Sequence, residues 1–161
     1  MKRHYYIGLS LFILIVVLIA DQLTKWVVAT QMMIGDSFTV IPNFLSITSH
    51  RNNGAAWGIL SGQMGFFILI TIVIIIALVV FYIREAKNNL FMQVAISLLL
   101  AGALGNFIDR VMNGEVVDFV DTLIFGYDFP IFNIADASLT LGVGLLVILL
   151  LTDKTNDKRK V

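Results

Sequence analysis

Four long apolar runs divide this chain and determine its predicted secondary structure. They cover residues 7–28, 66–83, 90–109 and 134–151, and the second run is uncharged over 18 residues. A helix needs about 20 predominantly apolar residues to cross the hydrocarbon core of a bilayer. The pattern therefore predicts four membrane-spanning helices, with a charged turn at Arg84–Asn89 between the second and the third.

The first run has an alternative interpretation. Basic residues precede an apolar stretch from Ile7 to Ala20, which is also the outline of a signal peptide. However, no small-x-small cleavage site follows, and the run continues past Asp21 and Lys25 to resume at Trp26. We therefore interpret this run as the first membrane helix.

Residues 29–65 interrupt the helical pattern. Glycine, asparagine and proline punctuate them, and two short β-branched and aromatic stretches, Phe38–Ile41 and Phe44–Thr48, are typical of strands. We expect a small β-sheet over about residues 35–53, lying on the membrane surface. Trp57, in the turn that follows, is expected to anchor the chain at the membrane interface.

Composition agrees with a membrane protein. Hydrophobic residues make up 58% of the 161 residues and charged residues 14%, whereas average soluble domains carry about 25% charged residues. The predicted fold class is a membrane all-α protein with a small β element, formed by one domain over residues 1–161. The absence of cysteine excludes disulfides, thiolate nucleophiles and cysteine-ligated metals. We expect no cofactor, no metal and no nucleic-acid partner, and a monomer surrounded by membrane lipid.

Basic residues lie almost wholly on one side of this four-helix arrangement. The positive-inside rule makes that side cytoplasmic. We therefore expect both termini in the cytoplasm, and the β-sheet and most of the acidic residues near the outer face of the membrane. The basic residues on the inner side are Lys2, Arg3, Arg84, Lys87, Lys154, Lys158, Arg159 and Lys160, and the outer loops hold only Arg51 and Arg110.

Polar side chains from distant parts of the chain converge at the outer face. Asp21 and Lys25 are four apart on one helix face, either as a local ion pair that eases burial or as a link to a polar site. Asn133 with Asp136 three residues later resembles a helix cap, which gives Asp136 a structural explanation. Asp118 has apolar neighbours and is expected in an apolar, hydrogen-bonded loop. Further candidates are Asn53, Asn106, Asp109 and Arg110.

A pair of carboxylates is the chemistry that these residues fit best. A hydrolytic metal would need an all-carboxylate site, and His50, which a serine nucleophile would need as its base, is expected to be a surface residue. Two close carboxylates cannot both ionise easily, so they share one proton. The ionised member then takes a proton from water while the protonated member polarises the scissile carbonyl. Spacing alone does not choose the pair among Asp118, Asp121, Asp128 and Asp136.

Five motifs in order along the chain resemble the lipoprotein signal peptidases, or signal peptidase II. This family consists of bacterial aspartic endopeptidases with four helices. The resemblance implies that Asp118 and Asp136 are the catalytic dyad, and that the substrates are prolipoproteins cleaved just before a diacylglyceryl-modified cysteine. It also implies inhibition by the cyclic peptide globomycin. The motifs are Asp21–Lys25, Asn53–Trp57, Gly105–Arg110, Val117–Phe119 and Phe132–Asp136.

The remaining candidates have supporting roles in this interpretation. Asn53, Asn106, Arg110 and Asn133 are expected to hold the substrate backbone and the dyad, with Asp21, Lys25 and Asp109 behind them. Two other functions compete. Buried acids also occur in proton-coupled transporters, although four short helices without an internal repeat leave little room for alternating access. The acids could also bind a basic partner in a non-enzymatic assembly factor.

Overall fold

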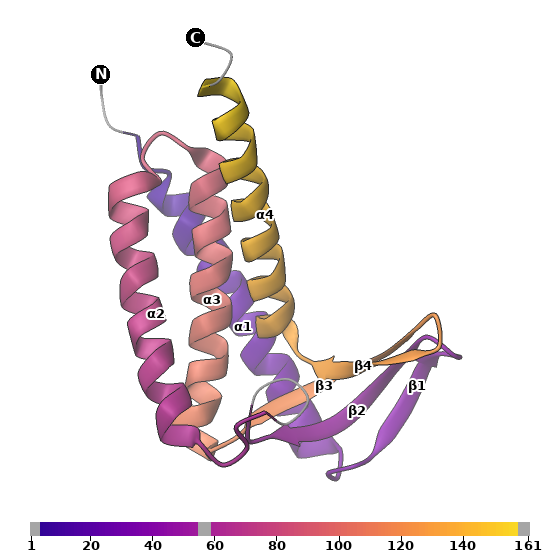
Figure 1. Cartoon of the computed structure of the whole chain (residues 1–161). Coiled ribbons are helices and arrows are strands. Elements are labelled where there is room, and N and C mark those ends of the chain that lie inside the picture. Colours follow the sequence, from indigo (N-terminus) through magenta and orange to yellow (C-terminus); the bar gives the residue numbers. More distant parts are fainter. Residues whose placement is uncertain (1–3, 55–58, 158–161) are drawn as a thin grey trace.

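Helices and strands are segregated in the computed structural model, which describes residues 4–54 and 59–157 (Figure 1). Trp57 and the basic residues Lys2, Arg3, Lys158, Arg159 and Lys160, for which the sequence made predictions, lie outside the described residues. The helices are α1 (Ile7–Gln31), α2 (Met64–Glu85), α3 (Leu90–Asn113) and α4 (Ile134–Asp157). The strands are β1 (Ser37–Ile41), β2 (Leu45–Asn52), β3 (Val116–Ile124) and β4 (Tyr127–Phe132).

The predicted membrane helices are confirmed. Within the described part of the chain, four helices are long and apolar enough to cross a membrane. Each extends a few residues beyond its apolar run, because backbone hydrogen bonding continues into the polar flanks until a cap stops it. In α3, for example, the Asn89 side chain accepts a hydrogen bond from the Met92 amide at 3.0 Å, and Gly114 ends the helix with φ of 72°.

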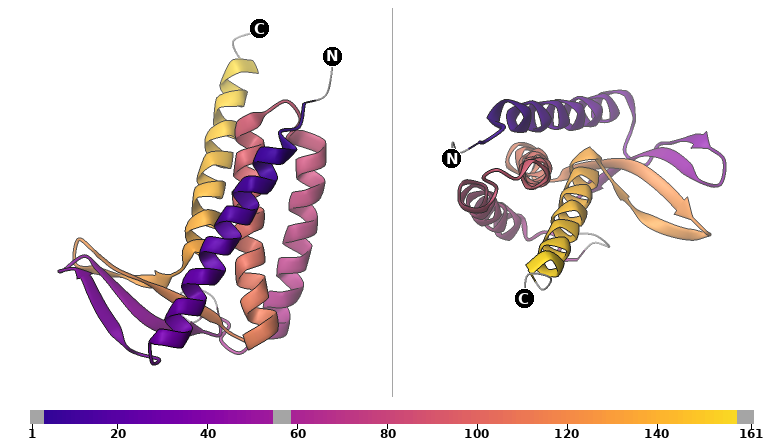
Figure 2. Two further views of the ribbon diagram at one scale, coloured as in Figure 1. Left: turned by 180° about the vertical axis from the view of Figure 1, so that it is seen from behind. Right: turned by 90° about the horizontal axis from the view of Figure 1, so that it is seen from above.

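The central helix of the bundle is α3, which contacts α1, α2 and α4 (Figure 2). Glycines allow this close packing. A Cβ atom on Gly105 would lie 2.5 Å from a carboxylate oxygen of Asp21 and 3.1 Å from the Cβ of Ala135. The small residues in the second half of this helix therefore bring α1 and α4 close to α3, as the sequence predicts.

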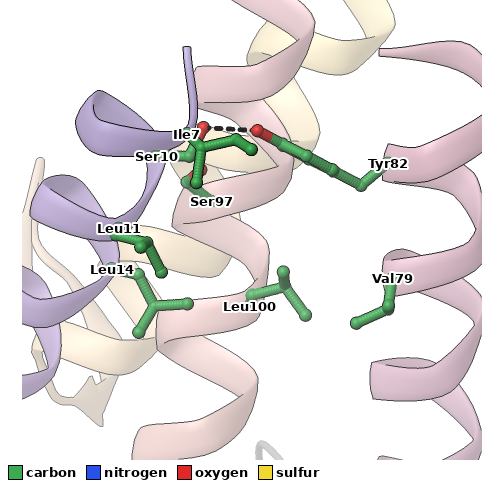
Figure 3. Close-up of a pocket in the computed structure, with 8 residues that line it drawn as sticks. All are labelled: Ile7, Ser10, Leu11, Leu14, Val79, Tyr82, Ser97 and Leu100. Atoms are coloured by element: carbon green, nitrogen blue, oxygen red, sulfur yellow. Dashed lines mark hydrogen bonds between the residues drawn. The ribbon is translucent and has the colours of Figure 1, made fainter. Parts of the chain in front are cut away.

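At the end of the bundle near the chain termini, hydrogen bonds join three helices. Ser10 and Tyr82 share a hydrogen bond of 2.8 Å between their hydroxyls, and Tyr82 donates to Gln93 at 3.1 Å (Figure 3). An apolar pocket of about 140 Å³ lies beside them and contains no carboxylate, so it is not a candidate for the predicted chemistry. It is lined by Ile7, Ser10, Leu11, Leu14, Val79, Tyr82, Ser97 and Leu100.

At the opposite end of the bundle, the strands form one antiparallel sheet in the order β1-β2-β3-β4 (Figure 1). The sequence predicted only the half of it within residues 35–53. It missed β3 and β4, and the expectation that Asp118 lies in a loop is wrong, since Asp118 pairs with His50 across β2 and β3. The first four residues of β3 are all buried. A strand buried on both faces shows no alternation of apolar and polar residues, which is why the pattern concealed it.

Candidate active site

Asn133 connects the two aspartates that the sequence singled out. Asp118 lies on β3, and Asp136 lies in the first turn of α4. The side-chain amide of Asn133 donates to Oδ1 of Asp118 at 2.7 Å, and its backbone N–H donates to Oδ2 of Asp136 at 3.2 Å. One residue therefore holds both carboxylates, which lie 18 positions apart in the chain.

The same asparagine caps α4. Its Oδ1 accepts a hydrogen bond from the backbone N–H of Asp136 at 2.9 Å, and the Asp136 carboxylate accepts in return from the Asn133 N–H. This reciprocal pair is a capping box, so the cap that the sequence indicated is confirmed. The cap leaves Oδ1 of Asp136 free to accept from another element.

Asn106 of α3 makes that contact. Its Nδ2 donates to Oδ1 of Asp136 at 2.7 Å. Its Oδ1 accepts from Nζ of Lys25 at 3.0 Å and from Nδ2 of Asn133 at 3.2 Å. The two donors occupy the carbonyl end of this amide, so the amino end is directed at the carboxylate.

Lys25 is the centre of a buried charge cluster. Its side chain is 3% exposed, and its ammonium lies 2.8 Å from Oδ2 of Asp21 and 3.0 Å from Oδ2 of Asp109. The Asp21–Lys25 pair is therefore a local ion pair and also a link from α1 to α3. Gln22 strengthens this link by donating to Asp109 at 3.1 Å and to the Gly105 carbonyl at 3.2 Å.

The two acids of this cluster also hold the residues next to the candidate pair. Oδ1 of Asp21 accepts from the backbone N–H of Ala135 at 2.8 Å. Oδ2 of Asp109 accepts from the backbone N–H of Val117 at 3.3 Å. Ala135 directly precedes Asp136 and Val117 directly precedes Asp118, so both candidate aspartates are positioned from one ion cluster.

The asparagine that contacts Asp118 from β2 is one that the sequence analysis did not single out, and the role expected of Asn53 toward the substrate stays a prediction. The described contacts of Asn53 are with the loop, where its side chain accepts from the Ser61 hydroxyl, and they do not include the candidate pair. Asn52 instead donates to Oδ2 of Asp118 at 3.0 Å. The only signal that could have found it is the strand period, because Asn52 ends β2 opposite Val116.

Arg110 of α3 lies over an aromatic ring of α2. Its guanidinium carbon lies 5.1 Å from the centre of the Phe67 ring, which is a cation–π distance. Its Nε is buried and has no hydrogen-bond partner in the described part of the chain. The guanidinium therefore has donor capacity left for a bound molecule.

Burial and charge change the acidity of Asp118. Burial, and then the charge of Asp136, raise the pKa of Asp118 from 3.8 to about 6. Hydrogen bonds from Asn52 and Asn133 and the charge of Lys25 oppose this rise. The charge of Asp136 thus acts on Asp118, as expected of two carboxyls that share a proton.

The arrangement suits proton transfer to and from water. It supplies two interacting carboxyls, fixed amide donors and a cation that lies behind them. Among the described residues, no group of three or more histidine, cysteine, aspartate or glutamate side chains could hold a metal ion.

Comparisons with known proteins show which family this chain is similar to. The family model described as signal peptidase (SPase) II matches residues 13–152. The chain is 74% identical to a lipoprotein signal peptidase of Staphylococcus haemolyticus over 158 residues, covering 98% of this chain and 100% of the relative. It is 69% identical to one of Staphylococcus aureus, covering 99% and 98%. A solved bacterial membrane enzyme has 70% identity and a TM-score of 0.93, covering 97% of this chain and 95% of that one.

The ion cluster predicts a large loss of stability on Asp21→Ala. This change removes a partner of buried Lys25 and the acceptor of the Ala135 N–H. Loss of one partner from a buried pair costs about 3–5 kcal/mol. Thermal unfolding of the purified protein in detergent should show a clearly lower midpoint.

Asp128→Ala is the matched control, because Asp128 is exposed on the sheet. It should unfold close to the wild-type temperature. An Asp21→Ala protein as stable as this control would contradict the structural role of the cluster.

Proposed function

This chain belongs to the signal peptidase II family of lipoprotein signal peptidases, and on that premise we propose that Asp118 and Asp136 are its catalytic pair. The protein is a membrane aspartic endopeptidase that cleaves the signal peptides of prolipoproteins. The proposal concerns which residues perform this hydrolysis and on which side of the membrane they work.

One observation carries the assignment. Asn133 donates from its side chain to Asp118 and from its backbone to Asp136. The other acids of the described polar cluster, Asp21 and Asp109, both form ion pairs with Lys25. One ammonium thus pairs with both of those acids, whereas neither Asp118 nor Asp136 forms an ion pair in the described part of the chain.

The hydrolysis proceeds with one proton on the pair. The ionised carboxyl takes a proton from a water molecule as that water attacks the scissile carbonyl carbon, and the protonated carboxyl donates to the carbonyl oxygen. The resulting tetrahedral intermediate collapses when the leaving amine takes up a proton and the peptide C–N bond breaks. The amides of Asn106 and Asn133 keep both carboxyls oriented throughout, and Arg110 has unused donors for the substrate backbone.

The substrate is a prolipoprotein whose cysteine carries diacylglyceryl, and cleavage occurs just before that cysteine. This part of the proposal follows the family. The position of the sheet supports it, because the sheet lies at the same end of the bundle as Asp118 and Asp136 and can cradle the peptide outside the membrane (Figure 1). Globomycin is expected to occupy the same place.

The catalytic assignment predicts that Asp118→Asn and Asp136→Asn each abolish turnover. An amide cannot take a proton from water, and such proton transfer contributes about 10²–10⁴-fold to a rate. Cleavage of a diacylglyceryl-modified prolipoprotein by the purified variants in micelles should fall by at least that factor, with thermal unfolding showing that they remain folded.

Asp121→Asn is the control, because Asp121 lies three positions from Asp118 on the same strand and bonds to Thr48 instead. It should keep most of the activity. A folded Asp118→Asn or Asp136→Asn enzyme with near-normal turnover would show that the pair is wrong, and peptide cleavage that requires an energised membrane would contradict simple hydrolysis.

The raised pKa of Asp118 predicts the pH dependence. The rate should fall at low pH, where both carboxyls are protonated, and at high pH, where the pair loses its last proton. Because the pKa of Asp118 is raised to about 6, that last proton leaves at about pH 6 or above. The alkaline limb of kcat/KM should therefore lie well above the pKa of a solvated aspartate, and a chelator should not change the profile.

Asn52→Ala tests the sign of this effect. Asn52 donates to the Asp118 carboxylate and so favours its ionised form. Its loss should raise the pKa of Asp118 further and move the alkaline limb to higher pH. Asn53→Ala, at the neighbouring position, should leave the limb where it is. A downward movement in Asn52→Ala would argue against Asp118 as the group that carries the proton.

We propose that both termini are cytoplasmic and that the catalytic pair is near the outer face. The support is the distribution of basic residues along the sequence. The chain contains no cysteine, so single cysteines can be introduced without background. An impermeant thiol reagent added to intact cells should label Ser37→Cys and Asn113→Cys but not Glu85→Cys, and the reverse pattern would invert the topology.

A further inference from the structure

The sheet has one apolar face and one polar face beyond the bundle. In the paired strands, Phe38, Ile47 and Val120 form one row across β1, β2 and β3, and the adjacent row is Thr39, Ser46 and Asp121. Side chains alternate between the faces of a sheet, so successive rows face opposite ways. The next row is again apolar in three of its four members, Ile41, Leu45, Thr122 and Phe129.

Much of the apolar face is uncovered. Phe38 is 67% exposed and Tyr127, in the row of Ile124, is 56% exposed. The polar face instead carries hydrogen bonds typical of a surface in water, since the Thr48 hydroxyl contacts Ser37 at 2.8 Å and donates to Asp121 at 2.6 Å. An apolar patch of this extent on the surface of a protein marks an interaction site.

The apolar face continues the lipid-exposed surface of α1. Ile47 of this face packs against the buried cluster that contains Val28 of α1. A groove of about 300 Å³ separates the two surfaces, and its walls include residues of α1 that are largely exposed. The groove is lined by Leu23, Thr24, Val27, Val28, Ile47 and Phe119.

The hairpin tips lie at the level of the helices rather than beyond them. Both hairpins extend sideways from the bundle and slope back toward the end that holds the chain termini (Figures 1 and 2). If the bundle spans the bilayer, the tips enter the layer occupied by lipid.

The turn between β3 and β4 has an unusual residue at its tip. Phe125 and Gly126 have φ values of 51° and 80°. A two-residue turn with positive φ at both positions favours asparagine or aspartate before the glycine. Phenylalanine is strained there, and its side chain is fully exposed. Strained backbone positions are common at functional sites, so the conformation at Phe125 points to a use for its side chain.

We propose that this apolar face and the two hairpin tips insert into the outer-leaflet interface of the bilayer that the helices span. The anchors are Phe125 and, in the turn between β1 and β2, Phe44, which is 49% exposed. The partner is the boundary between lipid headgroups and acyl chains, where aromatic side chains are favoured. β3 carries Asp118 near one end and leads to Phe125 at the other. Insertion of the tip therefore fixes the depth of Asp118 relative to the lipidated end of a substrate. The inference rests on the proposed outer position of the sheet but not on the catalytic assignment.

Spin labels on single cysteines test the insertion. Phe125→Cys and Tyr127→Cys are labelled in an Asp136→Asn background and reconstituted into lipid-only nanodiscs. Asp128→Cys is the matched control, because Asp128 neighbours Tyr127 but pairs with Leu123 on the other face. Collisions with oxygen, which dissolves in lipid, are compared with collisions with a water-soluble nickel complex.

Labels at 125 and 127 should show a severalfold higher ratio of oxygen to nickel collisions than the label at 128. If the label at 125 collides with the nickel complex as often as the label at 128, the proposal is overturned. The apolar face would then be expected to bind a protein partner instead of lipid. The collision ratio reports the depth of a label and does not depend on turnover. The measurement therefore stands whether or not the dyad assignment holds. Cleavage assays on the Asp118 and Asp136 variants fail or succeed separately.

Discussion

A buried cation is the constraint on which the rest of this structure depends. Lys25 lies within an apolar bundle, and an ionised group removed from water costs several kcal/mol unless it is paired and hydrogen-bonded. Its ammonium meets this requirement with Asp21 from its own helix and Asp109 from α3. Those carboxylates have further oxygens to satisfy, and they accept the backbone N–H groups of Ala135 and Val117. The acids that pair with this one charge therefore also position the start of α4 and the start of β3, the two elements that carry the proposed catalytic pair.

Asp136 caps a helix and is also a member of the proposed catalytic pair. It completes the capping box of α4 with Asn133, and the N-terminus of a helix favours negative charge. Asp118 lies in a different setting, a buried strand where desolvation, followed by the charge of Asp136, raises its pKa to about 6. The two carboxyls thus differ in environment, and the raised pKa of Asp118 allows the proposed pair to retain one proton up to about pH 6.

The sequence predicted those features whose causes are local. Hydropathy predicted the four helices, and residue spacing predicted the Asp21–Lys25 pair and the cap at Asn133. The sequence pattern could not predict β3, because a strand buried on both faces does not alternate between apolar and polar residues. It also could not distinguish Asn52 from Asn53, since that choice depends on register between strands more than 60 positions apart. The joining of Asp109 to Val117 and Asp21 to Ala135 depends on helix packing, which Gly105 permits and no local pattern encodes.

Asn106 connects the ion cluster around Lys25 with Asp136 of the proposed catalytic pair. Its carbonyl oxygen accepts from Lys25 and its amino group donates to Asp136. An aspartate at this position would satisfy the lysine but would add a third negative charge beside the two carboxyls. An apolar residue would leave an acceptor site of Asp136 and a donor of Lys25 unsatisfied, at about 1–3 kcal/mol for each buried group. Only a neutral side chain with an acceptor at one end and a donor at the other joins the two clusters without merging their charges. Because Lys25 and Asn133 both donate to its oxygen, these two residues decide the orientation of the amide, and its amino group is thereby directed at Asp136 of the proposed pair.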